Sequence, residues 1–194
     1  PEMLMTGTLE PTNSAYATAK LAGIELCRAY RREYGDKFIS AIPANIFGPG
    51  DDFISDNSHV VAGLMRKMHE AKEKKDDVVE IWGSGKPKRE FIYVDDLSSA
   101  CIFVMVNYEN SNPINAGTGI ALTINELAQL IMDIVGYDGT IKFDTRKPDG
   151  VPEKILDSKK LFKLGWSPSV MIQSGLEQTY KWFKSSYLEE YSNK

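Results

Sequence analysis

The alternation of helix-patterned segments with short apolar runs constrains the fold of this chain more than any other feature of its sequence. Residues 14–34 carry apolar side chains at helical spacing and are followed by Gly35, a residue type that commonly lies just past a helix end. The apolar run of residues 38–47 then breaks at a Pro-Gly pair, which predicts a buried strand that leads into a loop. Residues 58–75 return to the helical spacing with a basic end. This order predicts an α/β fold with a partly parallel sheet.

The second half of the chain continues the same order of elements. Strands are expected, in chain order, at residues 78–82, 90–94 and 112–116. A helix at residues 96–106 separates the last two strands, and the tail from Lys160 onwards predicts one short helix and a longer one over residues 176–191.

Two glycines, Gly117 and Gly119, follow the third of these strands and resemble part of a nucleotide-binding loop. The third glycine of such a loop is lacking, and Thr123 with Glu126 forms the T-x-x-E pattern of a capping box at the start of a helix. We therefore interpret the two glycines as structural.

The composition excludes several classes of protein. The 194 residues are 42% apolar, enough for a sizeable core, and the formal net charge of −4 gives no general attraction to nucleic acid or to an anionic membrane. No apolar run approaches the roughly 20 residues of a membrane span. The two cysteines, Cys27 and Cys101, stand in helix-patterned apolar stretches, which predicts buried thiols in a reducing compartment rather than a disulfide. We expect a cytoplasmic protein without a metal site.

Tyr16 and Lys20 form a Y-x-x-x-K pattern within the first predicted helix. This spacing places the two side chains on one helical face, and a nearby ammonium stabilises the phenolate that remains when a tyrosine gives up its proton. Small residues between the two leave room for a cofactor. A second such pattern, Tyr180 and Lys184, stands among bulky aromatic residues in the tail and is interpreted as a surface pair.

Further motifs follow Tyr16 and Lys20 in an order that is typical of one enzyme family. The segment "ANIFGP" at residues 44–49 matches an N-x-[FY]-G-P loop, and "REFIYVDDL" at residues 89–97 matches an arginine followed by F-x-x-V-x-D. On these residues the chain resembles the extended short-chain dehydrogenase/reductase family. The more specific resemblance is to the subfamily that converts GDP-4-keto-6-deoxy-D-mannose to GDP-L-fucose, through "GTLEPTNSAYATAKLAG", "DNSHVVAGLMRKMHEA", "VEIWGSGKPKREFIYVDDL", "NAGTG" and "KPDGVPEKILD".

The resemblance implies a reaction in two parts, epimerisation at carbons 3 and 5 of the sugar followed by NADPH-dependent reduction at carbon 4. It assigns Tyr16 as the proton donor at the ketone and Lys20 as the residue that holds the nicotinamide ribose and tunes Tyr16. It makes His59 the acid of the epimerisation and a cofactor contact. The other histidine, His69, is expected to be a structural or surface residue.

The resemblance also implies two groups of binding residues. The nicotinamide would be lined by the strand-end residues Pro43, Ala44, Asn45 and Ile46, and the GDP-sugar would be bound by Lys67, Trp82, Arg89 and Asp149. At the position of Lys67 the family commonly has arginine, so the charge is kept and the bidentate fork is lost. From the residues alone, Trp82 could also be a core tryptophan and Asp149 a turn aspartate.

The fold implied is the C-terminal part of an extended short-chain dehydrogenase/reductase, with an incomplete Rossmann-type parallel sheet and a smaller α/β substrate-binding domain. Residues 1–50 would be the remainder of the NADP-binding domain, and residues 51–194 mostly the GDP-sugar-binding domain, with about 90–120 returning to the first. The sequence contains no G-x-x-G-x-x-G turn for the cofactor pyrophosphate, so we expect this chain by itself to be inactive. Cys27 lies too far along the helix from Tyr16 to replace the family's catalytic cysteine.

Two alternatives remain open at this point. Another nucleotide-sugar epimerase or dehydratase of the same family would share Tyr16, Lys20 and "FIYVDDL", and a non-catalytic substrate-binding or dimerisation fragment would need no cofactor loop. The resemblance further implies a homodimer that pairs through the helices near residues 14–34 and 58–74, whose outward apolar positions would otherwise be exposed.

Overall fold

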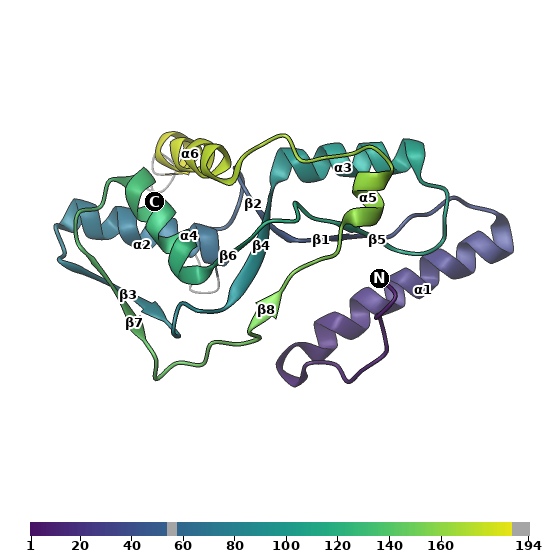
Figure 1. The fold of residues 1–194 in the computed structure, drawn as a ribbon, viewed down its shortest axis with the longest axis horizontal. Coiled ribbons are helices and arrows are strands. Elements are labelled where there is room, and N and C mark those ends of the chain that lie inside the picture. The colour runs from purple at the N-terminus through teal and green to yellow at the C-terminus, as the bar shows by residue number, and fades with distance from the viewer. Residues whose placement is uncertain (54–57, 188–194) are drawn as a thin grey trace.

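A computed structural model of the protein describes residues 1–53 and 58–187, and its arrangement of helices around mostly parallel strand pairs confirms the α/β prediction (Figure 1). The helices are η1 (Pro11–Asn13), α1 (Ser14–Tyr34), α2 (Val60–Lys74), α3 (Val94–Asn107), α4 (Ile124–Val135), α5 (Lys159–Lys163), α6 (Ile172–Trp182) and the π-helical η2 (Phe183–Tyr187). The strands are β1 (Ala41–Pro43), β2 (Asn45–Phe47), β3 (Val78–Trp82), β4 (Lys88–Tyr93), β5 (Ile114–Ala116), β6 (Ala121–Thr123), β7 (Thr140–Asp144) and β8 (Glu153–Lys154).

The strands form short pairs rather than one continuous sheet. Parallel pairing joins β1 to β5, β2 to β4, β3 to β7 and β4 to β8, and β6 is antiparallel to β4. The prediction of a single strand over residues 38–47 is wrong, because the chain passes at Ala44 from the β1–β5 pair to the β2–β4 pair. At this crossing the end of β1 is followed, after one residue, by the start of β2.

Helix ends lie where the local sequence signals predict them. Gly35 ends α1 with a φ of 76°, in the left-handed region that glycine adopts without strain. At the start of α4, Thr123 and Glu126 make both hydrogen bonds of the predicted capping box. The expected long tail helix is divided between α6 and η2, and its predicted residues 188–191 lie outside the described part of the chain.

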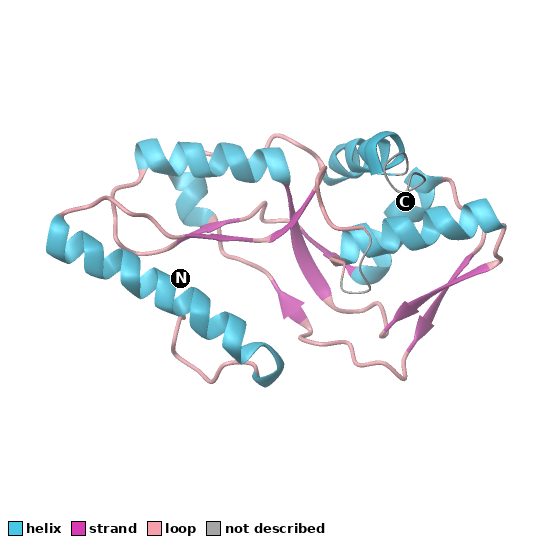
Figure 2. Cartoon of the chain, turned by 180° about the vertical axis from the view of Figure 1, so that it is seen from behind, coloured by secondary structure: helices cyan, strands magenta, loops and turns pink. Residues whose placement is uncertain are grey.

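Two clusters of buried apolar side chains stabilise the two ends of the molecule. The first packs α2, α4 and α6 against β3, with Met65, Ile131 and Leu176 fully buried. The second packs α3 and α5 against β5 and includes Leu161 and Trp166. Figure 2 shows the same division from behind, with β2 and β4 passing between the two ends. None of the helices in the described ranges has the length and apolar character needed to cross a membrane.

Several predictions of exposure are corrected by the structure. Cys101 is exposed on α3 and Cys27 is only half-buried, and both are free thiols. Tyr180 is 7% exposed, so the Tyr180–Lys184 pair is not a surface pair, although Lys184 itself is exposed. The apolar side chains of α2 pack inside the chain, whereas no residue of α1 is buried. Exposed apolar surface is therefore a property of α1 and not of α2.

Candidate active site

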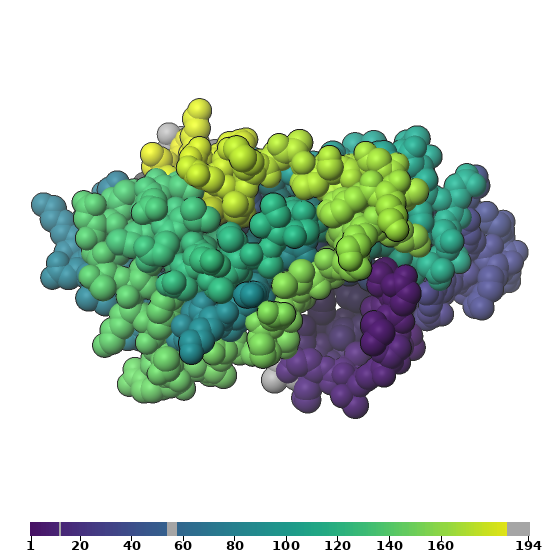
Figure 3. Space-filling model, in the orientation of Figure 1, coloured from purple at the N-terminus to yellow at the C-terminus, as the bar shows by residue number. Residues whose placement is uncertain are grey.

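One large cavity brings together all the residues that the sequence singled out as catalytic or binding residues. It lies between the N-terminal segment with α1 and the ends of β1 to β4, and Figure 3 shows its hollow between the N-terminal residues and the stretch around β8. Its volume of about 1980 Å³ exceeds the roughly 300–1,000 Å³ of a pocket for one small molecule. Its wall includes Tyr16, Lys20, Pro43, Ala44, Asn45, Ile46, His59, Lys67, Trp82, Arg89 and Asp149.

Tyr16 and Lys20 lie one turn apart on α1 and face this cavity together. The Lys20 Nζ atom is 5.3 Å from the centre of the Tyr16 ring, close enough for the ammonium to interact with the ring. Tyr16 is 60% exposed, so a ligand in the cavity can reach its side chain. The helix thus presents a phenol and a cation to the same part of the cavity.

The strand-end residues line the cavity where the chain crosses from β1 to β2. The Ala44 amide donates to the Ala116 carbonyl at 3.0 Å, and the Asn45 Nδ2 donates to the Glu90 carbonyl at 2.8 Å. These bonds fix the backbone beyond β1 and leave the Asn45 side-chain carbonyl oxygen for a ligand. Because ligands in α/β proteins bind beyond the carboxyl ends of strands, a ligand is expected to bind at this position.

His59 lies immediately before α2, at the edge of the cavity. Its Nδ1 atom is 3.0 Å from Oδ1 of Asp51, and its side chain is 78% exposed. Sequence reasoning did not single out Asp51, because an aspartate in a glycine-containing loop reads as an ordinary turn residue. Only the fold brings the two side chains together.

Trp82 stands at the end of β3 with its indole 65% exposed, so the reading as a core tryptophan is wrong. The Nζ atoms of Lys67 and Lys147 lie 5.8 Å and 5.1 Å from the centre of the indole ring. Lys147 was not singled out from the sequence, although it stands in the "KPDG" segment that contains Asp149. An aromatic face flanked by two ammonium groups suits a planar ligand that carries negative charge.

Arg89 and Lys154 place two more cations on the cavity wall. The two residues are register partners on the parallel strands β4 and β8, and both line the cavity. One guanidinium nitrogen, Nη1, donates to the Lys88 carbonyl at 2.8 Å, which fixes the direction of the Arg89 side chain. Lys154 was also missed, since nothing in the sequence indicates that β8 pairs with β4.

Asp149 joins two loops that are far apart in the sequence. Its Oδ1 accepts a hydrogen bond from the Ser84 amide at 2.5 Å, and its Oδ2 accepts one from the Ser84 hydroxyl at 2.7 Å. These bonds, the backbone one first, lower the pKa of Asp149 below its ordinary value. The carboxylate is therefore ionised near neutrality. It stabilises the turn after β3 rather than the turn in which Asp149 itself lies.

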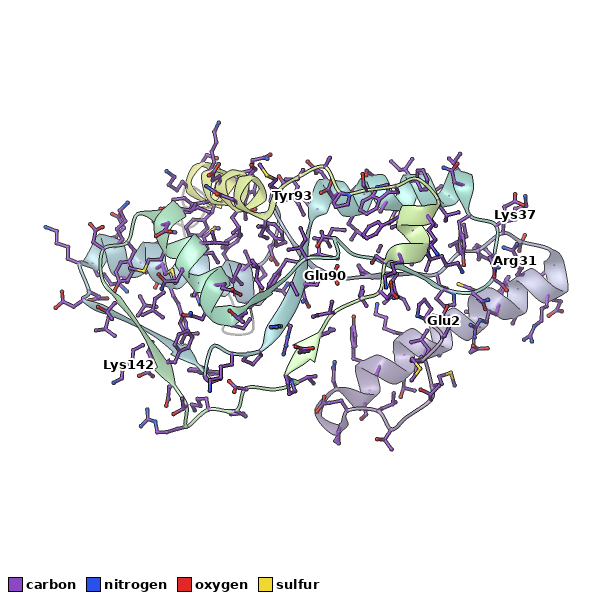
Figure 4. The ribbon with its side chains drawn as sticks, in the orientation of Figure 1. Glu2, Arg31, Lys37, Glu90, Tyr93 and Lys142 are labelled. Atoms are coloured by element: carbon purple, nitrogen blue, oxygen red, sulfur yellow. The ribbon has the colours of Figure 1, made fainter. Side chains whose placement is uncertain are left out.

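A buried carboxylate, Glu90, was missed as well, although it does not line the cavity. Glu90 is 1% exposed and lies in the middle of the molecule (Figure 4). Its two oxygens accept hydrogen bonds from the amides of Gly119 and Leu156, each at 2.8 Å. A Cβ atom at Gly117 would lie 2.2 Å from Glu90 Oε1, so the glycine pair surrounds this carboxylate. The glycines have the structural role that the sequence predicted.

His69, which the sequence set aside as a structural or surface residue, lies apart from the functional groups. His69 is buried in the core, with Nδ1 at 3.0 Å from the Tyr180 hydroxyl, and neither residue lines the cavity. Cys27, on α1, does line the cavity, whereas Cys101 does not.

Comparisons with known proteins agree on the family to which this chain is similar. The family model "NAD dependent epimerase/dehydratase family" matches residues 1–117. The chain is 48% identical over 187 residues to "Putative GDP-L-fucose synthase 2" of Arabidopsis thaliana, covering 96% of the chain and 57% of that relative. It is 49% identical over 189 residues to the GDP-L-fucose synthase of Escherichia coli, covering 93% and 59% respectively.

A solved structure is similar over the same region. The GDP-L-fucose synthetase of Naegleria fowleri bound to NADP superposes with a TM-score of 0.91 at 32% identity, over 96% of this chain and 60% of that chain. The chain thus spans somewhat more than half the length of each of these proteins.

Proposed function

Because the chain belongs to the NAD dependent epimerase/dehydratase family, we propose that the protein acts as a GDP-L-fucose synthase. In this reaction GDP-4-keto-6-deoxy-D-mannose is epimerised at carbons 3 and 5 and then reduced at carbon 4. The observation that carries the proposal is the single cavity that gathers Tyr16 with Lys20, His59, and the cations around Trp82. The names of the relatives at 48% and 49% identity support the same substrate.

The cavity has groups that fit NADP(H) on one side. The Lys20 ammonium can donate hydrogen bonds to ribose hydroxyls, and the strand-end residues Pro43, Ala44, Asn45 and Ile46 form a wall beside it. The NADP-bound relative supports this choice of cofactor. When bound, NADPH supplies the hydride for carbon 4.

Tyr16 has the same partner atom in both halves of the proposed reaction, the oxygen on carbon 4. During epimerisation its hydroxyl donates a hydrogen bond to this oxygen while negative charge develops there. During reduction the hydroxyl gives its proton to the same oxygen, and Lys20 stabilises the phenolate that remains. The exposure of Tyr16 toward the cavity and the position of Lys20 support this role.

His59 has the separate task of returning a proton to the sugar ring. The ketone acidifies the protons on carbons 3 and 5; after a base has removed one of them, a protonated imidazole can give its proton to the carbanion that remains. Inversion requires that the proton returns to the opposite face of the ring. The placement of His59 before α2, apart from Tyr16 on α1, supports delivery from another direction.

We assign the GDP moiety to the part of the cavity wall that holds Trp82 and the cations around it. Its two phosphates need cations, which Arg89 and Lys154 supply from adjacent strands and Lys67 from α2. Arg89 can hold phosphate oxygens in a bidentate fork, whereas Lys67 acts as a point charge. Trp82 offers an aromatic face, and the ionised Asp149 accepts hydrogen bonds from hydroxyl or N–H groups of the nucleoside.

The proposal extends to the organisation of the protein. Residues 1–50 and about 90–120 would form the cofactor side, and most of residues 51–194 the GDP-sugar side. We also propose a cytoplasmic homodimer. The exposed side chains of Leu26 and Tyr34 on α1 support an interface there, and the two free thiols support a reducing compartment.

The competing function is that of another nucleotide-sugar epimerase or dehydratase, which would use Tyr16 and Lys20 without reduction of a GDP-4-keto sugar. Purified full-length protein should be offered GDP-4-keto-6-deoxy-D-mannose and, separately, UDP-glucose, each with NADPH. We expect NADPH to be consumed only with the GDP-sugar. Interconversion of UDP-glucose and UDP-galactose without net NADPH consumption would replace our proposal by the competing one.

A further inference from the structure

The proposed reaction assigns no role to the carboxylate of Asp51, which lies beside His59. Its Oδ1 atom lies 3.0 Å from the Nδ1 atom of His59, and its side chain is 12% exposed while that of His59 is 78% exposed. The pair therefore joins a partly buried acid to an accessible imidazole. Such an arrangement holds a histidine ring in one orientation and one tautomer.

The loop that carries Asp51 is fixed on both sides. A Cβ atom at Gly48 would lie 2.6 Å from the Val94 Cγ1 atom, so this part of the loop packs closely against the start of α3. Phe53 is fully buried in the core on the other side. Between them the Asp52 amide donates to Asp51 Oδ1 at 2.9 Å. Asp51 consequently has little freedom to follow a moving ring.

His59, by contrast, depends on Asp51 for its orientation. It is the N-cap residue of α2, but its side chain makes no capping hydrogen bond. In residues 1–53 and 58–187 the structure gives Asp51 as its side-chain hydrogen-bond partner. Without that contact the exposed ring could rotate about its χ angles in solvent.

The second oxygen of Asp51 adds an independent observation. Oδ2 is buried and has no hydrogen-bond partner among the described residues. A buried polar atom without a partner costs stability. A doubly protonated ring at His59 offsets part of that cost, since a carboxylate bonds more strongly to an imidazolium than to a neutral donor.

We propose that Asp51 is a positioning residue for His59, an inference that rests on the proposed epimerisation. Its carboxylate accepts the Nδ1–H of the ring and so leaves Nε2 to face the cavity. When His59 gives its Nε2 proton to the carbanion at carbon 3 or 5, the carbanion's electron pair forms the new C–H bond. The electrons of the broken N–H bond stay on Nε2, and the Nδ1–H to Asp51 is unchanged.

The tautomer of His59 tests the positioning directly and does not depend on activity. Long-range ¹⁵N–¹H spectra of the full-length protein distinguish a neutral ring protonated at Nδ1 from one protonated at Nε2, and the His59→Gln variant identifies the signal. We expect the Nδ1–H form in the parent protein and a shift to the Nε2–H form, which free histidine favours, in Asp51→Ala. The same tautomer in both proteins would overturn the proposal.

Catalysis provides the second measurement. In Asp51→Asn, which keeps the shape of the side chain, deuterium exchange into carbons 3 and 5 should slow by about 10- to 100-fold, by analogy with residues that orient a metal-bound imidazole. The affinities for GDP and NADPH should be unchanged. Asp52→Asn is the matched control, since it removes the same charge one residue away and keeps the Asp51 carboxylate.

The outcomes separate this inference from the function on which it rests. A parent protein that binds the GDP-sugar but exchanges no deuterium contradicts the proposed epimerisation, whatever the tautomer of His59. A parent protein that is active, with exchange as fast in Asp51→Asn and Asp51→Ala as in the parent, contradicts only the role of Asp51.

Discussion

The Nζ atom of Lys20 lies 5.3 Å from the centre of the Tyr16 ring, and both side chains face the cavity. The second Y-x-x-x-K pair is at least as close, with Lys184 Nζ at 4.8 Å from the Tyr180 ring. Tyr180 is nevertheless buried, and its hydroxyl lies 3.0 Å from His69 Nδ1. Access to the cavity, rather than proximity of the pair, therefore distinguishes a candidate proton donor from a core tyrosine.

Replacement of Tyr16 by phenylalanine should abolish most of the reduction. Tyr16→Phe removes the proposed proton donor and preserves the ring, so hydride transfer to the 4-keto sugar should fall by about 10²–10⁴-fold, the usual contribution of general acid catalysis. Single-turnover oxidation of NADPH measures this rate. Tyr180→Phe is the matched control: it should leave the rate unchanged and lower the free energy of unfolding by about 1–3 kcal/mol, because His69 loses its buried partner. Reduction by Tyr16→Phe at the parent rate would remove Tyr16 from the mechanism.

The replacement of His59 should separate the two half-reactions. His59→Gln keeps a polar side chain but cannot return a proton, so inversion at carbons 3 and 5 should be impaired while NADPH affinity is retained. Product stereochemistry by NMR shows which centres have been inverted. Correctly inverted product formed at the parent rate would contradict the assignment of His59.

His69 should make the stability of the fold depend on pH. Burial lowers the pKa of His69 below its ordinary value of about 6.5, so the unfolded chain binds this proton more readily than the folded one. The stabilisation from neutral His69 is therefore complete above about pH 6.5 and is lost as the pH falls below that value toward the folded pKa. Urea unfolding at pH 7.5 and at pH 5.5 should show a loss of stability on acidification that is smaller in His69→Gln. An equal pH dependence in both proteins would show that other groups cause it.

Substitution of Gly117 should affect stability and not cofactor binding. In Gly117→Ala the new Cβ would lie 2.2 Å from the buried Glu90 Oε1, so the carboxylate must move away from the amides that it binds. We expect unfolding to become easier by about 1–3 kcal/mol, the usual cost of overpacking. Thermal unfolding and NADPH titration of the same variant test this. Unchanged stability with lost NADPH affinity would instead identify the glycines as part of a cofactor loop.

Much of the fold and of the site could be predicted because its signals are local. The ends of α1 and the capping box of α4 depend on a few adjacent residues, and the sequence shows both. The family resemblance, which the match over residues 1–117 confirms, located residues from distant segments that do line one cavity. Their individual roles remain predictions.

The features that could not be predicted depend on contacts between distant segments. The β1–β2 crossing at Ala44 exists because two different strands, β5 and β4, pair on either side of it. The pairing of β8 with β4 that brings Lys154 beside Arg89 is equally remote in sequence. Cys101 was expected to be buried because its neighbours are apolar, but α3 is covered on one face only and Cys101 lies on the other.

Isotope labelling of the product tests most directly the central claim that epimerisation and reduction both occur in this cavity. The full-length protein should be incubated in D₂O with GDP-4-keto-6-deoxy-D-mannose and unlabelled NADPH, and the product analysed by NMR. The proposed mechanism predicts GDP-L-fucose with deuterium at carbons 3 and 5, from proton exchange, and protium at carbon 4, from the cofactor. A reduced sugar with protium and uninverted configuration at carbons 3 and 5 would contradict it.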